Sequence, residues 1–435
     1  MSTQNRRSIF FFAKDEKTCY NIPKAKRGGF DMKYEAAIIG GGAAGLAAAV
    51  TASHMGLNAV LVEAQNRVGR KLLSTGNGRC NLTNREAAKE HHYHGEEKEA
   101  AHILRQMPPE KILDFFQHLG LPCRELAQGR MYPCSLQAAS VLDTLRIALT
   151  DTGIPICCDF FVKDLKPNNG YFQIIGKSGQ ILEAKQVLLC TGGKAAPSLG
   201  GNGSGLELAR KLGHSLTAVR PGLTGILCPS QRAKPVKGAR NSAKAILLRG
   251  RKTIASTQGE VQFSEQGLSG ICIQELSRWI SDPANEYMVA LDLLPDWDRQ
   301  QVQNHLLQRA QSPSLPASQL LCNCMNRLIA TEVARLALPK GGLACQLTEY
   351  QLRQLGEEAK KFCFPVTGLQ SWNNAQVMVG GISLQEVEKT SMASLCCPNL
   401  YFAGEILNVD GDCGGFNLHW AWATGILAAK AMASK

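Results

Sequence analysis

Near the start of the chain, apolar runs alternate with glycine-rich and polar segments in a regular order. A short apolar run at 36–39 leads into the glycine-rich segment 40–45, and an Ala- and Leu-rich segment then continues to Met55. A second apolar run at 59–62 ends on Glu63. This order predicts strand, turn, helix and strand, which together form a βαβ unit.

Periodic patterns predict further elements between residues 98 and 212. Two segments have helical spacing and three have the short apolar runs of strands. The helices are predicted at 98–119 and 136–150, and the strands at 156–165, 171–176 and 181–190. The glycine-rich segment 200–205 follows no strand, so we interpret it as a loop before a helix at 206–212.

We expect an α/β protein whose Rossmann-like domain is discontinuous. Short apolar runs broken by Gly and Pro at 216–295 predict a β-rich module, and Leu- and Gln-rich sequence at 297–360 predicts helices. An apolar helix at about 418–433 would return to the first sheet. The predicted boundaries are 32–215 plus 376–435 for the Rossmann-like domain, 216–296 plus 361–375 for an inserted β-rich domain, 297–360 for an inserted helical domain, and 1–31 for an N-terminal tail that is disordered or not native.

The glycine turn indicates a dinucleotide ligand. Gly40 permits a tight turn, Gly42 lets the backbone approach a pyrophosphate, and Gly45 lets helix and strand pack closely. The helix N-terminus would offer free N–H groups to the phosphates. Glu63 lies near the ~20-residue offset at which a carboxylate binds the cofactor ribose. Because this carboxylate would repel a 2′-phosphate, FAD or NAD fits the unit better than NADP.

The chain is basic, with a formal net charge of +12. Residues 1–31 carry seven Lys or Arg and three Asp or Glu, which accounts for +4. The other basic residues form no run of five or more, so we interpret them as a solvated surface that attracts anionic substrates. Nucleic acid is not expected as a partner.

The cysteines and the hydropathy pattern indicate a cytoplasmic protein. The chain has sixteen cysteines but no signal peptide, so we expect free thiols rather than a disulfide framework. The close pairs lack partners at zinc-finger distances, and we predict no metal site. No window approaches ~18 consecutive apolar residues, so we predict no membrane span.

Three blocks of sequence together resemble a known group of flavoproteins. They are GGGAAG with Glu63 and the extension RVGRKLLSTGNGRCNLTN, the strand and turn LLCTGG, and the closing YFAGEILNVDGDCGGFNLHWAWATG. In this order they resemble the two-dinucleotide-binding-domain flavoproteins. More narrowly, they are similar to the BaiN/RdsA-type NAD(P)/FAD-dependent oxidoreductases, also called YhiN or HI-type flavoproteins. The resemblance extends from Tyr34 to the end of the chain.

The resemblance implies that the Rossmann-like domain binds FAD. Glu63 would hold the adenosine ribose, and Arg70 and Lys71 would meet the pyrophosphate or the adenine end. Residues 75–81 would line the ribityl chain and the flavin. The backbone of Val162 would contact adenine.

The last helix would complete this site. Its N-terminus would face the pyrimidine edge of the flavin, where a positive dipole end stabilises the anionic reduced form. Asp410 would take part in this contact or serve only as a turn residue or helix cap. The predicted cofactor-binding residues are Gly40, Gly42, Ala43, Ala44, Gly45, Glu63, Ala64, Arg70, Lys71, Thr75, Gly76, Asn77, Gly78, Asn81, Val162, Thr191, Gly192, Gly193, Gly404, Glu405, Asp410, Gly415, Asn417 and Leu418.

Two residues bear on the reaction type. His419 stands where Gln is common in the family, and it would either donate a proton near the flavin or be structural. Cys80 has no partner at C-x₄-C spacing, which disfavours a disulfide-reductase mechanism. We assign no catalytic residue.

The resemblance implies an FAD-dependent oxidoreductase. NAD(P)H would bind transiently and reduce the flavin, and the hydride would pass to an unsaturated or carbonyl-conjugated small molecule, by analogy a dehydro bile acid. Three alternatives stay open: an oxidase of a small amine-like substrate, a tRNA-associated flavoprotein, and a flavoprotein whose FAD is structural or regulatory.

Overall fold

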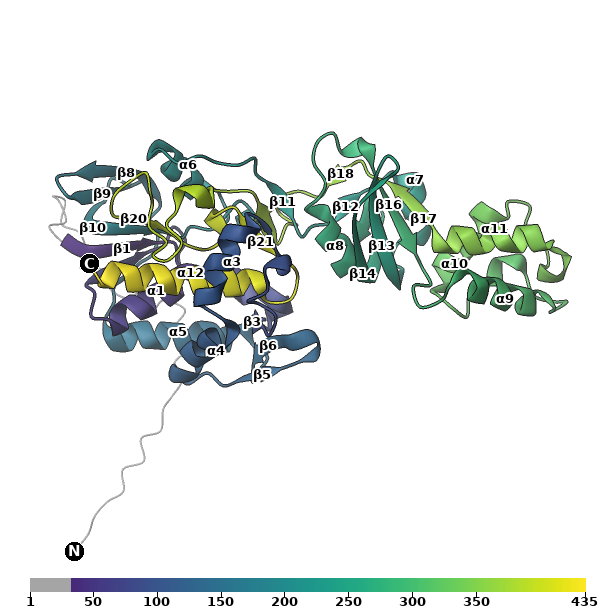
Figure 1. The fold of residues 1–435 in the computed structure, drawn as a ribbon, viewed down its shortest axis with the longest axis horizontal. Coiled ribbons are helices and arrows are strands. Elements are labelled where there is room, and N and C mark those ends of the chain that lie inside the picture. Colours follow the sequence, from purple (N-terminus) through teal and green to yellow (C-terminus); the bar gives the residue numbers. More distant parts are fainter. Residues whose placement is uncertain (1–32) are drawn as a thin grey trace, which may run out of the picture.

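The computed structural model describes residues 33–435, and the predicted tail at 1–31 lies outside them. Two separate hydrophobic cores divide the described chain. We call the parts the first body, residues 33–222 and 377–435, and the second body, residues 226–369. Figure 1 shows them side by side along the longest axis, with α9 (Arg299–Ala310), α10 (Arg327–Ala337) and α11 (Glu349–Lys360) at the end of the second body away from the first.

A seven-stranded sheet forms the centre of the first body. Its order is β7-β2-β1-β10-β9-β8, with β20 pairing the last part of β10. Strands β7, β2, β1, β10 and β20 are parallel, whereas β9 and β8 are antiparallel to their neighbours. The bounds are β1 Lys33–Ile39, β2 Ala59–Val62, β7 Ile156–Cys157, β8 Val162–Asn168, β9 Tyr171–Gly176, β10 Ile181–Leu189 and β20 Leu400–Phe402.

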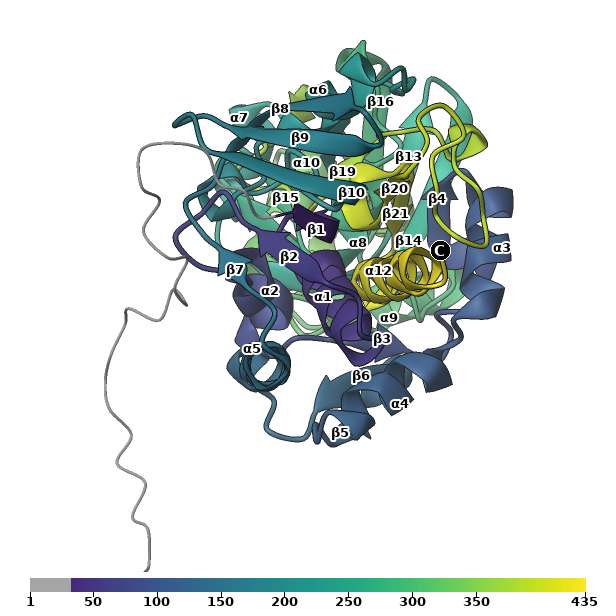
Figure 2. The ribbon, with the colours of Figure 1, turned by 90° about the vertical axis from the view of Figure 1, so that its left-hand side faces the viewer.

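Apolar helices from the N-terminal and C-terminal parts of the described chain pack on this sheet. Helix α1 (Ala43–His54) packs against α12 (Phe416–Ala433) and α5 (Ala138–Thr152), and Figure 2 shows all three on the same side of the sheet. The mostly buried surface of α1 and α12 explains their Ala-rich sequences. The C-terminal segment thus returns to the first sheet.

Smaller elements surround this core. The helices are α2 Arg70–Ser74, α3 Glu97–Gln106, α4 Pro109–His118 and α6 Ser204–Lys211. The strands of two small sheets are β3 Thr83–Asn84, β6 Arg130–Pro133 and β5 Cys123–Glu125, and β4 Tyr93–Gly95 with β21 Val409–Gly411.

Two predicted elements differ from the structure. The helix expected at 98–119 is two helices, because Pro108 and Pro109 lack the N–H groups that would continue α3. The strand expected at 156–165 is divided into β7 and β8, and Asp159 between them has a positive φ of 55°.

The second body is an antiparallel sheet with helices at one end. The strand order is β17-β16-β13-β14-β15-β12-β18. The strands are β12 Ile226–Leu227, β13 Arg240–Arg249, β14 Lys252–Ser264, β15 Gly267–Ser269, β16 Tyr287–Asp292, β17 Phe362–Pro365 and β18 Gly368–Leu369. The helices are α7 Ser230–Ala233, α8 Ile271–Ser277, α9 Arg299–Ala310, α10 Arg327–Ala337 and α11 Glu349–Lys360.

A short two-stranded ladder stands where the chain passes between the bodies. Strand β11 (Arg220–Gly222) pairs antiparallel with β19 (Val377–Val379). One crossing of the chain follows β11 and the other precedes β19. No helix in the described part of the chain is long and apolar enough to cross a membrane.

Candidate active site between the two bodies

The glycine turn has the close contacts that a dinucleotide site needs. Gly40 has φ +117°, and a Cβ there would lie 2.5 Å from the carbonyl oxygen of Cys190. A Cβ on Gly45 would lie 1.8 Å from the oxygen of Gly40. A Cβ on Gly42 would meet nothing within 4 Å, and α1 begins there without a side-chain cap. The first N–H groups of α1 are therefore open to an anionic ligand.

Glu63 lies at the end of β2 beside this turn. Its Oε2 accepts from the Gly41 N–H at 2.7 Å, and its Oε1 accepts from the Gln65 N–H at 2.8 Å. Burial raises the pKa of this carboxyl group, while the backbone N–H donors and Arg70 act in the opposite direction. The carboxylate is held in a fixed orientation where the βαβ pattern expects a ribose.

Arg70 and Lys71 face different partners. Arg70 donates to Gln65 Oε1 and, at 3.0 Å, to the carbonyl oxygen of Ser198. Lys71 Nζ lies 2.7 Å from Glu405 Oε2, and Glu405 Oε1 accepts from the Met378 N–H. The structure thus joins the predicted residues Lys71 and Glu405, and it places Arg70 next to the Glu63 segment.

The 75–81 loop meets the N-terminus of α12. Gly76 and Asn77 have left-handed backbone angles, and Gly415 has φ +102° at the helix start. A Cβ on Gly415 would lie 2.9 Å from Asn81 Oδ1, an atom that is buried and has no hydrogen-bond partner among the described residues. Asn417 bonds both backbone groups of Gly411 and so fixes the turn before α12.

The remaining predicted residues lie along the same edge of the sheet. Thr191, Gly192 and Gly193 follow β10, and Gly404 follows β20, where a Cβ would lie 3.1 Å from the Cβ of Ala44. Val162 begins β8, and the nearby Phe160 N–H donates to the Glu63 carbonyl oxygen. Open N–H groups, close-packed glycines and an unpartnered amide oxygen fit an extended dinucleotide. FAD bound here would supply two-electron redox chemistry.

The buried surroundings of His419 and Cys80 do not suit a reactive role for either side chain. His419 is 0% exposed, its Nδ1 lies 2.8 Å from Thr83 Oγ1, and burial lowers its pKa to about 4. Burial raises the pKa of Cys80 to about 12, so its thiol is not a nucleophilic thiolate. The geometry favours the structural interpretation of His419.

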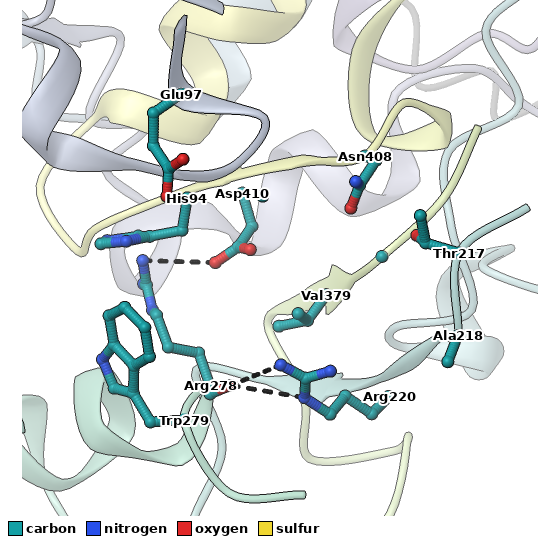
Figure 3. A pocket seen from close by; sticks show the side chains of 12 residues that line it. His94, Glu97, Thr217, Ala218, Arg220, Arg278, Trp279, Val379, Asn408 and Asp410 are labelled. Atoms are coloured by element: carbon teal, nitrogen blue, oxygen red, sulfur yellow. Dashed lines mark hydrogen bonds and ion pairs between the residues drawn. The ribbon is translucent and has the colours of Figure 1, made fainter. Parts of the chain in front are cut away.

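A cavity of about 340 Å³ lies between the two bodies (Figure 3). The first body and the linking segments contribute most of its wall, and Arg278 and Trp279 come from the second body just after α8. The lining residues are His94, Gly95, Glu97, Thr217, Ala218, Arg220, Arg278, Trp279, Val379, Gly380, Asn408 and Asp410.

A buried ion pair joins the bodies at this cavity. Arg278 Nη1 lies 3.2 Å from Asp410 Oδ2 and 3.1 Å from Asp412 Oδ1, and the side chains of Arg278 and Asp410 are each 2% exposed. Arg278 Nη2 donates to the Gly411 carbonyl oxygen. Arg220 in turn donates from Nε and Nη2 to the carbonyl oxygen of Arg278. Two guanidinium groups are thereby fixed in the cavity wall.

Two histidines surround Asp412. His94 Nε2 lies 2.9 Å from its Oδ1, and His92 Nδ1 lies 3.0 Å from its Oδ2. The ring of His94 packs edge-on against Trp279. This arrangement places a cluster of ionisable groups at the junction of β4, β21 and the second body.

Comparison with known proteins gives the family. Residues 34–431 match the family described as HI0933-like protein Rossmann domain. The chain belongs to the HI0933-like Rossmann family. It is therefore an oxidoreductase of the flavoprotein type, as the resemblance implied.

Curated relatives of this HI0933-like chain match it over nearly its full length. It is 36% identical over 409 residues to the 3-dehydro-bile acid delta(4,6)-reductase of Clostridium scindens, covering 92% of this chain and 98% of that protein. It is 24% identical over 411 residues to the ribosomal RNA dihydrouridine synthase of Escherichia coli, covering 92% and 98%.

The comparison with solved structures finds weaker similarities, of which two follow. A flavocytochrome c3 fumarate reductase in its open conformation is 17% identical with a TM-score of 0.48, covering 93% of this chain and 78% of that chain. The 3-ketosteroid-delta4-(5alpha)-dehydrogenase of Rhodococcus jostii RHA1 is 15% identical with a TM-score of 0.48, covering 94% and 98%.

Sequence reasoning missed most of the cavity. It named Asp410 for the cofactor but neither Arg278 nor His94. The one available signal for Arg278 is its position as a single charge in the otherwise uncharged, mostly apolar stretch 276–280, which is typical of a buried, paired arginine.

Proposed function

We propose that this protein is an FAD-dependent reductase of carbon–carbon double bonds conjugated to a carbonyl group. NAD(P)H reduces the flavin, and the substrate then takes up a hydride and a proton across the double bond. The substrate occupies the cavity between the bodies. The observation that carries this proposal is the pair of fixed guanidinium groups, Arg220 and Arg278, in the wall of that cavity.

Conjugate reduction is favoured by hydrogen-bond donors or positive charge beside the carbonyl oxygen of the substrate. Adding a hydride at the β-carbon moves the π electrons onto the carbonyl oxygen, which becomes an enolate. Preorganised donors stabilise such an oxyanion far better than water does. Arg220 uses two of its nitrogens to hold Arg278, and Figure 3 shows its guanidinium group at the cavity. It is the residue we expect to meet the substrate oxygen.

The names of the relatives support the same bond type. A 3-oxo group conjugated to a Δ4 double bond is an enone, and the C5–C6 double bond of uracil is conjugated to its C4 carbonyl. The reductase and the dihydrouridine synthase named above would thus both reduce a carbonyl-conjugated double bond.

The test is anaerobic stopped-flow spectroscopy of the FAD-loaded protein. The flavin should be bleached by NADH or NADPH, and it should be reoxidised without oxygen by an enone such as 4-androstene-3,17-dione. A flavin that stays oxidised with both nucleotides contradicts the NAD(P)H-linked reductase. Peroxide formation from an amine without nicotinamide would favour the oxidase.

A second candidate substrate is a uridine within RNA, and one feature of the second body favours it. Residues 221–259 contain eight Lys or Arg and no Asp or Glu. Seven of the eight are exposed, in and just before the β13–β14 hairpin. Lys244, Arg251 and Lys252 have no ion pair among the described residues, so their charge is available to phosphates.

The hairpin tip lies within reach of the cavity. The N–H of Gly250 at the tip donates to the carbonyl oxygen of Glu286 at 3.4 Å. Glu286 is seven positions after Trp279 of the cavity wall in the chain, so the two are at most roughly 25 Å apart. RNA bound along the hairpin could therefore present a base to the cavity.

The salt dependence of RNA binding tests this candidate. A variant with Lys244→Gln, Arg251→Gln and Lys252→Gln should bind single-stranded RNA more weakly, with a log–log salt slope smaller by about 2. The matched control changes Lys163, Lys177 and Lys185 to Gln, three exposed lysines of the first body. Equal slopes for the two triple variants would exclude the hairpin as an RNA site.

A further inference from the structure

Asp410 is a buried carboxyl group with an unsatisfied oxygen in the cavity wall. It is 2% exposed, and its Oδ2 has no hydrogen-bond partner among the described residues, although Arg278 Nη1 is 3.2 Å away. Arg278 Nε and Nη1 also lack hydrogen-bond partners. Leaving such atoms unpaired is costly in a folded protein, so their presence beside a cavity points to a ligand.

The other ionisable side chains around the cavity are less suited to donate a proton. His94 Nε2 is engaged by Asp412, and its ring packs against Trp279. Glu97, in the first turn of α3, is exposed to solvent, so its carboxyl group is not held in a fixed position against a bound substrate. His419 does not line the cavity.

We propose that Asp410 is the proton donor of the reduction, and that Arg278 is the positioning residue that holds its carboxyl group. This inference rests on the proposed function. It assigns the proton transfer, which is the second half of the conjugate addition, to Asp410.

FAD bound in the first body would supply the hydride that adds to the β-carbon, and the π electrons of the double bond then move onto the carbonyl oxygen. The enolate then re-forms the carbonyl group while its α-carbon takes the proton from the Asp410 hydroxyl, whose bonding electrons remain on the carboxylate. The substrate gains one hydride and one proton, and the flavin is oxidised. Water restores the proton to Asp410 once the product leaves.

The surroundings of Asp410 suit this role. Burial raises its pKa to about 6, and Asp412 and Glu405 act in the same direction, whereas Arg278 and Arg220 lower it. A general acid works best when its pKa lies near the working pH. After the transfer, the adjacent guanidinium group stabilises the carboxylate.

The first experiment is Asp410→Asn, which keeps the size of the side chain. In the FAD-loaded variant, oxidation of the reduced flavin by 4-androstene-3,17-dione should slow by at least about 100-fold. Flavin reduction by NAD(P)H should stay within a few-fold of wild type. The matched control is Asp143→Asn, an exposed aspartate of α5, which should leave both steps unchanged.

The second experiment follows the pH profile of the oxidation step. The wild-type rate should fall as pH rises through about 6, because Asp410 loses its proton. Arg278→Gln should move this fall to higher pH, since it removes a cation that lowers the pKa, and Arg220→Gln should move it less far in the same direction. A merely structural role for these arginines would leave the position of the fall unchanged.

Infrared difference spectroscopy gives a readout that needs no turnover. A protonated-carboxyl band that titrates near pH 6 should be present in wild type and absent in Asp410→Asn. If the variant oxidises its flavin like wild type, or the band is unaltered, the assignment of Asp410 fails while the proposed function stands. If wild-type protein reduces no conjugated carbonyl compound, the proposed function fails and the assignment with it.

Discussion

His419 shows how burial fixes the protonation state of a single residue. Its folded pKa of about 4 lies below the ordinary value of 6.5, because the ring is buried away from water. The unfolded chain therefore binds a proton at this histidine at a higher pH than the folded chain does. The stability associated with neutral His419 is complete above about pH 6.5 and is lost as pH falls through the interval from 6.5 to 4.

Replacing this histidine should reduce the acid sensitivity of the protein. Between pH 7 and pH 4.5, the free energy of unfolding of the His419→Gln variant should fall less than that of wild type. The difference between the two falls should be up to about 3 kcal/mol. Urea unfolding at the two pH values measures this difference. His118→Gln, an exposed histidine at the end of α4, is the control, and an acid loss in His419→Gln as large as that of wild type would contradict the prediction.

Glu63 provides the second prediction at this scale. Glu63→Gln keeps the shape of the side chain but replaces one oxygen by an NH₂ group. Because an NH₂ group cannot accept a hydrogen bond, one of the two bonds from the backbone N–H groups is lost. The amide also lacks the charge that would strengthen a bond from a ribose hydroxyl, and since losing a charge-assisted bond costs about 1.5–3 kcal/mol, FAD should bind about 10- to 100-fold more weakly. Quenching of flavin fluorescence in a titration of the apoprotein measures the change, and an unaltered affinity would remove Glu63 from the cofactor site.

At the scale of elements, the contact of α1 with α12 is unusually close. A Cβ on Gly425 would lie 2.3 Å from the backbone oxygen of Ala44, and Thr424 Oγ1 accepts from the Gly404 N–H at 2.9 Å. Backbone approaches backbone here, and no rotamer change can relieve an added methyl group. The position of the last helix over the glycine turn depends on this contact.

A methyl group at this contact should therefore separate the two helices. Gly425→Ala should lower the unfolding temperature, at a cost of about 1–3 kcal/mol, and should weaken flavin retention. Gly356→Ala in α11 is the matched control, since the atoms nearest to its added Cβ belong to the side chains of Val302 and Leu306. In Gly356→Ala, the gain in helix propensity should offset the cost of the close contact with these two side chains. Equal melting curves for the two variants would contradict this account.

The elements differ in how far the sequence could predict them. The βαβ unit and α12 were predictable because their signals are local: apolar runs, glycines and an acid at a set distance. The pairing of β13 with β16 was not, because β14, β15 and α8 separate these strands in the chain and their antiparallel order has no local signature. The cavity was not predictable either, since Arg278 and Asp410 are far apart in the chain and meet only through the packing of the two bodies.

At the scale of the whole molecule, the two bodies are joined by the chain and by a buried side chain. The chain passes between them beside the β11–β19 ladder, and Arg278 is buried against the first body. If the substrate occupies the cavity as proposed, it must enter between the bodies, so we expect the second body to move as a unit about this ladder.

Loosening the buried arginine should reveal this movement. Arg278→Gln should increase amide hydrogen exchange in residues 217–222 and 377–381, while exchange in β13 and β14 stays unchanged. Arg299→Gln, at an exposed ion pair with Glu357 of α11, should leave both regions as in wild type. Exchange that rises throughout the second body would indicate unfolding instead of hinge motion.

The last helix also sets the order in which the protein can mature. Because α12 occupies residues 416–433 and lies over the turn formed by residues 40–45, the nucleotide crevice would lack one wall until α12 has left the ribosome. We therefore expect coenzyme loading to follow the synthesis of α12, and synthesis under riboflavin limitation should yield a folded polypeptide without coenzyme.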